Sequence, residues 1–264
     1  MIAKTLKAFW LTSLASEMEY RANFITSSLY ALGQLAGTLF TLDVLYSKNY
    51  QFGASAGGAG WSRDAAYLVV AMFTLLDGIT SAALSPNLSR IVGHVQRGTL
   101  DFVLLKPLDA QFQLSTRNLT PWGFPNIVFG VLLIAYAGPR VPLGWQAYPL
   151  GFVAIVLSIL ILYALWFMVA TTTIWFTKVW NATEVLRSFI EAGKYPMAAF
   201  HPAVRFFFTF VLPVAFLTTV PVELMRGTAR PVFLAVEAGI AIILLTISRA
   251  FWKWALRYYT SASS

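Results

Sequence analysis

The stretch PLGFVAIVLSILILYALWFMVATTTIWF, residues 149–176, contains no charged residue over its whole length. A helix of about 20 apolar residues crosses a bilayer core of about 30 Å, so this stretch predicts a membrane-spanning helix. Five further apolar runs lie at about 23–46, 65–85, 120–138, 206–225 and 231–251. The sequence therefore predicts an all-α membrane protein with six transmembrane helices, in a single domain over residues 1–264.

The composition of the chain agrees with this class. Hydrophobic residues make up 58% of the sequence and charged residues 11%, whereas soluble domains carry about 25% charged residues. This balance excludes an ordinary soluble domain. The chain has no cysteine, which excludes disulfides and cysteine metal sites.

The chain has a net charge of +8, and most of its Lys and Arg residues fall on one side of the predicted membrane. With six spans, both termini lie on one side, together with fourteen basic residues: Lys4, Lys7, Arg21, Arg90, Arg97, Lys106, Arg117, Lys178, Arg187, Lys194, Arg205, Arg249, Lys253 and Arg257. The other side holds five: Lys48, Arg63, Arg140, Arg226 and Arg230. Because basic residues remain on the cytoplasmic side, we expect cytoplasmic termini, a plasma-membrane location (the inner membrane of a bacterium) and no nucleic-acid partner.

The segment before the first span, residues 1–21, has an apolar stripe of helical spacing. Leu6, Trp10, Leu14 and Met18 are four residues apart, so they lie close together on one side of a helix. Such a stripe predicts an interfacial helix on the cytoplasmic leaflet. The alternative is a frayed start of the first span.

The loop between the second and third spans, residues 86–118, contains an amphipathic pattern. Leu88, Ile91, Val92 and Val95 follow helical spacing and predict one apolar helix face. Gly98 can adopt the left-handed conformation that ends such a helix.

The stretch QRGTLDFVLLKPLDAQF, residues 96–112, follows and predicts a second short helix, held across the membrane surface. Thr99 is the expected N-cap, and Asp101 lies in the first turn, where a negative charge suits the helix dipole. The helix stops at Pro107. Its apolar face consists of Leu100, Val103 and Leu104. A capped helix with a charged tip predicts a docking surface.

Two segments nearer the C-terminus are less regular. Residues 177–205 predict a second cytoplasmic loop, which is ordered and whose helical pattern ends before Pro196 and Pro202. The predicted fifth span contains Pro213 and Pro221. Prolines inside a membrane helix leave backbone groups without partners, so we expect its outer half to be kinked, unwound or re-entrant.

Two acidic residues fall inside predicted spans. Asp77 lies midway along the second span and Glu237 about a third of the way into the sixth. A charge near the bilayer centre costs roughly 2.5 kcal/mol or more unless it is paired, hydrated or protonated. These acids therefore either line a polar path or are buried, hydrogen-bonded structural groups.

Sequence motifs for catalysis or nucleotide binding are missing. The chain contains no GxxxxGK[ST] and no HExxH pattern, so it has no phosphate-binding Walker loop and no zinc-protease helix of that kind. We therefore expect a non-enzymatic membrane protein that binds no cofactor itself.

The loop stretch resembles the signature of the ABC-2 type permeases, in the subgroup with six spans and a Gly-x-Leu-Asp-x-x-Leu-Leu-x-Pro core. The matching positions are Gly98, Leu100, Asp101, Leu104, Leu105 and Pro107. Tyr195-Pro196, Pro213 and Pro221 are similar to a second motif of this subgroup. The two motifs lie far apart in the chain, and the resemblance covers essentially its whole length.

The resemblance implies a permease subunit that pairs with a second copy or a related permease, within membrane lipids. Two separate ATP-binding subunits would hold ATP and Mg, and the loop helix would be a coupling helix that docks on them. In that element Gly98, Thr99 and Pro107 shape the backbone. The contacts to the ATPase would come from Arg97, Asp101, Lys106 and Asp109, and the anchors to the membrane domain from Leu100, Leu104 and Leu105.

Other functions stay open at this point. The main alternative is a proton-coupled secondary transporter or channel that uses Asp77 and Glu237; a membrane enzyme and a structural subunit are further ones. Aromatic residues make up 16% of the chain, which suits an amphiphilic or hydrophobic substrate, although packing against lipid explains them equally well. The family implies export.

Overall fold

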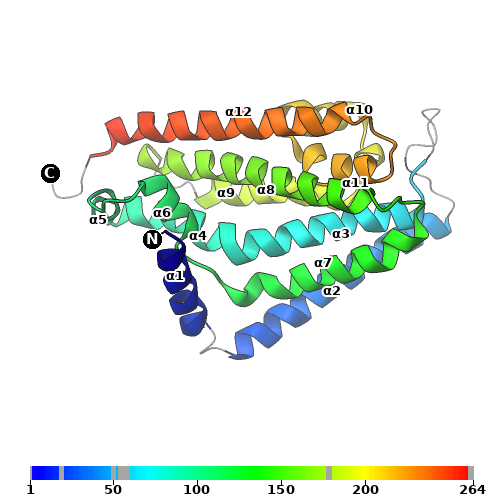
Figure 1. Ribbon diagram of the computed structural model, residues 1–264, viewed down its shortest axis with the longest axis horizontal. Helices are drawn as coiled ribbons and strands as arrows, with labels where there is room; N and C mark the ends of the chain where they lie inside the picture. The colour runs from blue at the N-terminus through cyan, green and yellow to red at the C-terminus, as the bar shows by residue number, and fades with distance from the viewer. Residues whose placement is uncertain (1, 18–20, 49–51, 53–59, 177–179, 261–264) are drawn as a thin grey trace.

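The computed structural model describes the chain except residues 1, 18–20, 49–51, 53–59, 177–179 and 261–264 (Figure 1). The described part is all-helical and contains no strand. The α-helices are α1 (Ile2–Glu17), α2 (Arg21–Ser47), α3 (Arg63–Ile79), α4 (Ser85–Gln96), α5 (Asp101–Leu104), α6 (Ala110–Thr116), α7 (Phe124–Ala137), α8 (Ala147–Thr171), α9 (Trp180–Glu191), α10 (Pro202–Phe206), α11 (Thr219–Met225) and α12 (Val232–Ala255).

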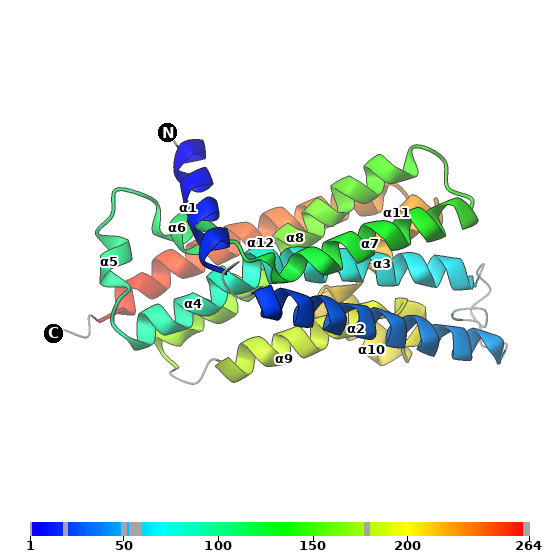
Figure 2. The ribbon, with the colours of Figure 1, turned by 90° about the horizontal axis from the view of Figure 1, so that it is seen from below.

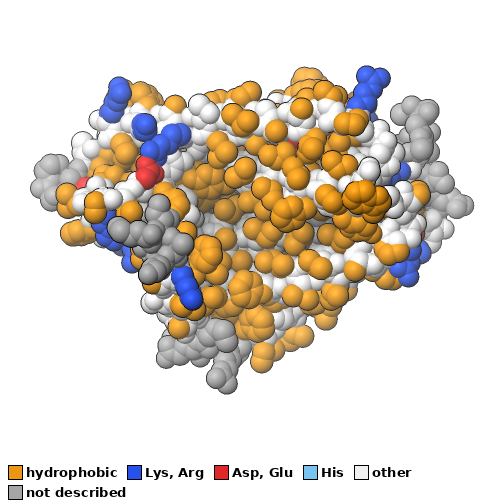
Figure 3. All heavy atoms as spheres, in the orientation of Figure 1, with side chains coloured by type: hydrophobic (Ala, Val, Ile, Leu, Met, Phe, Trp, Pro, Cys, Tyr) orange, Lys and Arg blue, Asp and Glu red, His pale blue; other side chains and the backbone are white. Residues whose placement is uncertain are grey.

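Five helical stretches within the described residues are long and apolar enough to cross a membrane. They are Ala22–Ser47, Arg63–Gln96, Pro121–Arg140, Ala147–Ile174 and Val232–Tyr258. Helices α3, α8 and α12 run along the long axis of the molecule, and α2 runs obliquely to it in Figure 1. Apolar side chains cover the middle of the face in Figure 3, and Lys and Arg gather toward its two ends. This distribution is typical of a protein embedded in a bilayer.

Helix α3 forms the centre of the bundle. Its residues from Ala65 to Phe73 are all buried, which a helix shows when neighbours surround it on every side. The closest of these neighbours is α7, where glycine allows the backbones to touch. A Cβ added at Gly130 would lie 2.8 Å from the backbone nitrogen of Leu75, so a larger residue there would push the two helices apart.

Helix α2 lies at the edge of the bundle and is loosely covered. Only Ala31 and Leu42 are buried along it. A Cβ added at Gly33 or at Gly37 would meet no neighbouring atom within 4 Å among the described residues. This small-residue face is therefore open toward lipid or a partner.

Helices α3 and α4 are joined by a π-helical turn, Thr80–Leu84, into one helix of 34 residues. At 1.5 Å per residue it measures about 50 Å, which exceeds a core of about 30 Å. The amphipathic face around Leu88 and Ile91 is buried as predicted, and Gly98 has the predicted positive φ of 65°. The amphipathic helix predicted around residues 88–95 is thus not a separate helix, because α4 continues α3 through the π-helical turn.

The predicted fifth span, 206–225, is not one helix. Helix α10 passes into a π-helical turn, Phe207–Val211, and the chain then breaks. Leu212 is extended (φ −118°, ψ 99°) and Pro213 has ψ 50°, because proline has no N–H to continue the helix. A 3₁₀ turn and α11 follow. Both α10 and α11 lie in the half of the molecule away from α1 (Figures 1 and 2).

Helix α9 lies among the long helices, whereas the sequence predicted residues 177–205 as a loop beyond their ends. It packs against α8 and α4 and lies at the edge of the molecule in Figure 2, with Leu186 and Ile190 buried. The difference arises because its charged residues, which we expected to face water, find partners inside the bundle.

Helix α1 runs across one end of the bundle, at right angles to the long helices (Figures 1 and 2). Trp10 donates its indole N–H to the backbone oxygen of Thr116 (2.9 Å), and the hydroxyl of Ser13 donates to that of Leu119 (2.9 Å). A helix is present over Ile2–Glu17 as predicted, its place at the membrane interface stays a prediction, and Met18 lies outside the described residues. The last turn of α12 lies at the same end as α1.

Candidate functional site

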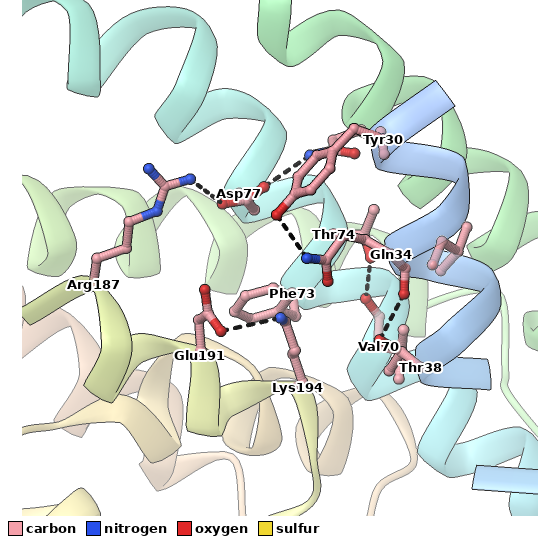
Figure 4. Close-up of a pocket in the computed structure, with 13 residues that line it drawn as sticks. Tyr30, Gln34, Thr38, Val70, Phe73, Thr74, Asp77, Arg187, Glu191 and Lys194 are labelled. Carbon is pink, nitrogen blue, oxygen red and sulfur yellow. Dashed lines mark hydrogen bonds and ion pairs between the residues drawn. The ribbon is translucent and has the colours of Figure 1, made fainter. Parts of the chain in front are cut away.

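A polar pocket opens between α2, α3, α7 and α9 (Figure 4). Its charged groups are Asp77 of α3 and three residues that follow one another on α9 and the turn after it, Arg187, Glu191 and Lys194. The spacing of these three, i, i+4 and i+7, places them on one helix face. Helix α2 completes the pocket with Tyr30, Gln34 and Thr38.

Asp77 has two partners in the pocket. Asn126 of α7 donates from Nδ2 to Oδ2 (2.8 Å), and Arg187 places Nη2 at 3.9 Å from Oδ1. The side chain is hydrogen-bonded and also lines an open pocket. Asp77 is thus hydrogen-bonded, as a structural acid would be, and it also lines a polar pocket, as an acid in a transport path would.

Glu191 and Lys194 form a second ion pair beside the first. The Nζ of Lys194 lies 3.3 Å from Oε2 of Glu191 and 5.3 Å from the ring centre of Phe73, a cation–π contact. The Glu191 side chain is 54% exposed. Charged groups do not face hydrocarbon unpaired, so this side of the pocket meets water or another polar surface.

Glu237 lies outside this pocket, in a sealed environment. It is fully buried, and the hydroxyl of Ser158 lies 3.2 Å from Oε1. The same hydroxyl lies 3.0 Å from the backbone oxygen of Phe216. The second carboxyl oxygen, Oε2, has no hydrogen-bond partner within the described residues. Asp77 and Glu237 are therefore not brought together.

The chain between α4 and α6 forms a helical tip at the end of the molecule that carries α1. Leu100 is fully buried and so is Val103, which lies one turn further along and on the same face. Phe102 is 68% exposed and Leu105 is 81% exposed. The prediction that Leu104 and Leu105 anchor this helix is wrong, because a four-residue helix has a single buried face and these two residues lie off it.

The predicted N-cap of the tip is also wrong. The N-cap position is Leu100, which makes no side-chain cap. The hydroxyl of Thr99 instead lies 2.8 Å from Nδ1 of His94. Thr99 thus ties the turn back to α4.

The polar residues of the tip differ in their surroundings. Asp109 caps α6 by accepting from the N–H of Phe112 (2.9 Å) and forms an ion pair with Arg249 of α12. Hydrogen bonding to Arg249 lowers the pKa of Asp109. Burial and the neighbouring Asp101 raise the pKa of Tyr259. Asp109 thus faces α12 and Asp101 faces Tyr259, just beyond the end of α12.

Arg97 and Lys106 are exposed at the tip. The guanidinium of Arg97 lies over Gly93, where an added Cβ would be 3.0 Å from Nη2. Pro107 ends the tip and is exposed. These three positions face outward from the bundle.

Pro213 and Pro221 lie far from the tip. Pro213 marks the break after α10, and Pro221 is buried near the start of α11. Neither proline lines the polar pocket, and their place in a translocation path stays a prediction.

Sequence analysis found one acid of the pocket and missed its partners. The sequence analysis placed Arg187 and Lys194 among the basic residues of the cytoplasmic side, and Asn126 carried no signal of its own. The available signal was the spacing of the three charged residues on one face of a segment whose other face is apolar. In the described residues, no group of His, Asp and Glu is arranged to hold a metal ion.

Comparison with known proteins identifies one family. The model of a family described as ABC-2 family transporter protein matches residues 32–263. No curated protein and no solved structure gives a significant match.

Proposed function

This chain belongs to the ABC-2 family of transporter proteins, and we propose that it is a permease subunit that exports an amphiphilic or hydrophobic substrate with energy from separate ATP-binding subunits. Two such subunits would bind ATP and Mg. The permease would pair with a second copy or a related chain in the plasma membrane, the inner membrane of a bacterium. The observation that carries the proposal is the exposed apolar tip at one end of the bundle.

The tip has the character of a docking element. Phe102 and Leu105 expose large apolar side chains to solvent, while Leu100 and Val103 anchor the backbone beneath them. Burial of an aromatic or leucine side chain stabilises a complex by about 1.5–3 kcal/mol. A groove in an ATP-binding subunit would bury both exposed residues, with Arg97 and Lys106 beside it.

The tip is joined to the pocket by one continuous helix. Residues Arg63–Gln96 form a single helical stretch, which carries Asp77 in its middle and ends at the tip. A shift of the tip on nucleotide binding would therefore move Asp77 against Arg187. Because the ATP-bound partner would favour one of two arrangements of the permease, the nucleotide would shift the equilibrium between them.

The polar pocket is our candidate for part of the translocation path. Its charged side chains need a polar neighbour on the side of α2, and the open face around Gly33 and Gly37 lets a second helix approach closely. A second permease copy would satisfy both requirements. Substrate would then pass between the two copies.

The topology of the proposal returns the chain to the outer side through α9 and the turn after it in place of 206–225. These 12 and 3 residues measure about 22 Å, less than a core of about 30 Å, so this limb would be a short crossing. The full crossings would be α2, α3–α4, α7, α8 and α12, with α10 and α11 entering and leaving from the outer side. Arg205 then moves to the outer side, and Arg187 and Lys194 lie within the bundle. The excess of basic residues stays with the termini, so both termini remain cytoplasmic under the positive-inside rule.

The test is co-purification of the tagged chain from its native cells in mild detergent. Wild type would retain a protein with a Walker loop, and the variant Phe102→Ser/Leu105→Ser would lose it. The matched control is Trp145→Ser, which removes an exposed aromatic side chain (77%) at the opposite end of the molecule. Equal recovery of the ATPase with the tip variant and wild type would refute the docking role.

A second measurement separates the proposal from a proton-coupled transporter. Inside-out vesicles with wild-type complex would accumulate a fluorescent amphiphile with ATP and without a pH gradient. Accumulation driven by a pH gradient alone, and abolished by Glu237→Gln, would favour the alternative. The separation of Asp77 from Glu237 argues against a single proton relay through both.

A further inference from the structure

A second pocket lies where α4, α5 and α6 meet, and it is basic. Its polar lining consists of Asn87, Arg90, His94, Gln113, Arg117 and Asn118. Among the residues that the structure describes, no carboxylate lines it. The site is distinct from the pocket around Asp77.

The cations here lack counter-charges. Arg90 donates from Nη1 to the neutral amide oxygen of Asn118 (2.7 Å), and Arg117 lies 5.9 Å from the ring centre of Phe9. Neither guanidinium forms an ion pair with any residue that the structure describes. Four cations act on the ring of His94: Arg97, Arg117, Arg90 and Lys106. The positive charge of this site is thus uncompensated.

A buried polar atom also lacks a partner here. Gln113 is 3% exposed, and its Oε1 has no hydrogen-bond partner in the described part of the chain. An unpaired buried polar group costs roughly 1–3 kcal/mol. A ligand that combines an anionic group with a hydroxyl donor would satisfy both features, because the guanidinium groups bind the anion and Gln113 accepts from the hydroxyl.

The pocket lies at the depth of lipid headgroups. Arg90 is 27 residues beyond Arg63 on one continuous helix, which is about 40 Å along the axis and about 10 Å beyond a 30 Å core. Helix α1 crosses the bundle at the same end (Figures 1 and 2), and its Trp10 and Leu11 are exposed. Exposed aromatic and apolar residues on such a helix are typical of the membrane interface.

We propose that this pocket binds the phosphate of an anionic phospholipid whose headgroup carries a hydroxyl, as phosphatidylglycerol does. Arg90 and Arg117 hold the phosphate, and Gln113 accepts from a headgroup hydroxyl. Since Arg117 also contacts Phe9 and its neighbour Thr116 binds Trp10, the lipid stabilises α1 against the base of the tip. The proposal does not depend on the transport function, because it concerns the purified chain and the bilayer alone.

The test is thermal unfolding of the purified full chain in detergent, titrated with phosphatidylglycerol or phosphatidylcholine. We expect phosphatidylglycerol to raise the melting temperature by several degrees, since a ligand at 100 times its Kd stabilises by about 2.7 kcal/mol, and phosphatidylcholine to have little effect. Arg90→Gln/Arg117→Gln would lose the difference. The control Lys253→Gln/Arg257→Gln, which removes two cations from the same end of the molecule outside the pocket, would keep it.

Three results would overturn the proposal. An equal shift with millimolar inorganic phosphate would identify a free anion as the ligand. An unchanged lipid shift in the Arg90/Arg117 variant, with loss of ATPase co-purification, would assign these cations to a protein contact. Equal shifts with both lipids would leave no role for the phosphate charge.

A second measurement covers the case in which the double variant does not fold. Native mass spectrometry of wild type and of the single variant Arg117→Gln counts the lipids retained on the chain. We expect wild type to retain phosphatidylglycerol in preference to phosphatidylcholine, and the variant to retain at least threefold less. Equal retention by the folded single variant would also refute the site.

Discussion

Asp77 and Glu237 both lie inside the helix bundle, and their surroundings differ. Asp77 has Asn126 and Arg187 as partners, in a pocket shared with exposed charged groups. Glu237 has Ser158 as its partner and is fully buried. The comparison teaches that an acid inside a membrane bundle is a candidate for transport only where water or substrate can reach it.

The largest effect is expected from Arg187→Glu. The pocket would then hold three acids and one cation, and an unpaired charge at this depth costs roughly 2.5 kcal/mol or more. A penalty of that size in the transport cycle corresponds to a loss of more than about tenfold. The measurement is ATP-driven accumulation of a fluorescent amphiphile by inside-out vesicles, normalised to folded protein.

The control for this prediction is a charge swap. Asp77→Arg combined with Arg187→Asp restores one ion pair across the same helices, so we expect partial recovery of transport. If Arg187→Glu alone transported at the wild-type rate, the pocket would have no role in the path.

Ser158→Val tests the surroundings of Glu237. Valine removes the hydrogen bond to Glu237, which leaves a buried carboxyl unsatisfied at a cost of about 1–3 kcal/mol, and it also adds bulk at a fully buried position. Ser158→Ala removes the hydroxyl without added bulk and is the matched control. We expect a lower melting temperature by several degrees, with transport per folded molecule unchanged. Thermal unfolding and the vesicle assay on one preparation check both parts.

Glu237→Gln is expected to change less than Ser158→Val. An amide can still pair with the serine hydroxyl, so we expect stability within about 1 kcal/mol of wild type and unchanged transport. Loss of transport with intact stability would show that Glu237 is a working acid, and the contrast with Asp77 would no longer hold.

The smallest effect concerns Asp109, an acid at the surface. Its pKa is lowered by Arg249, so the ion pair stabilises the fold above the unfolded pKa of about 3.9 and is lost as pH falls through the lower folded pKa. Asp109→Asn should reduce the melting temperature slightly at pH 7. The gap between variant and wild type should close below about pH 4, and a gap that widened there would contradict the assignment.

Some elements of the fold followed from local pattern. Residues 149–176 predicted α8 because spanning depends on apolar length, and Gly98 ends α4 with positive φ because few other residues adopt that conformation. The prediction of one span over 206–225 is wrong, whereas the irregular backbone expected from Pro213 and Pro221 is present, because proline lacks the N–H that continues a helix. The prediction that Leu105 anchors the tip is wrong because an apolar side chain suggests burial, while the geometry of the short helix turns this one outward.

The candidate site was predicted only in part. Asp77 was recognised because a carboxylate in an apolar run is costly, but Arg187 was assigned to a solvated loop. Their pairing joins residues that are 110 positions apart, and no local pattern reports such a contact.

The sequence alone determined the membrane class, the five long spans and the position of two acids within spans, because hydropathy and length act along the chain. Tertiary structure alone decided that α9 packs among the spans, that the tip exposes Phe102 and Leu105, and that Asp77 is open while Glu237 is sealed. The physical reason is that burial and charge pairing depend on which distant segments pack together, and in this protein those segments meet only when the bundle forms.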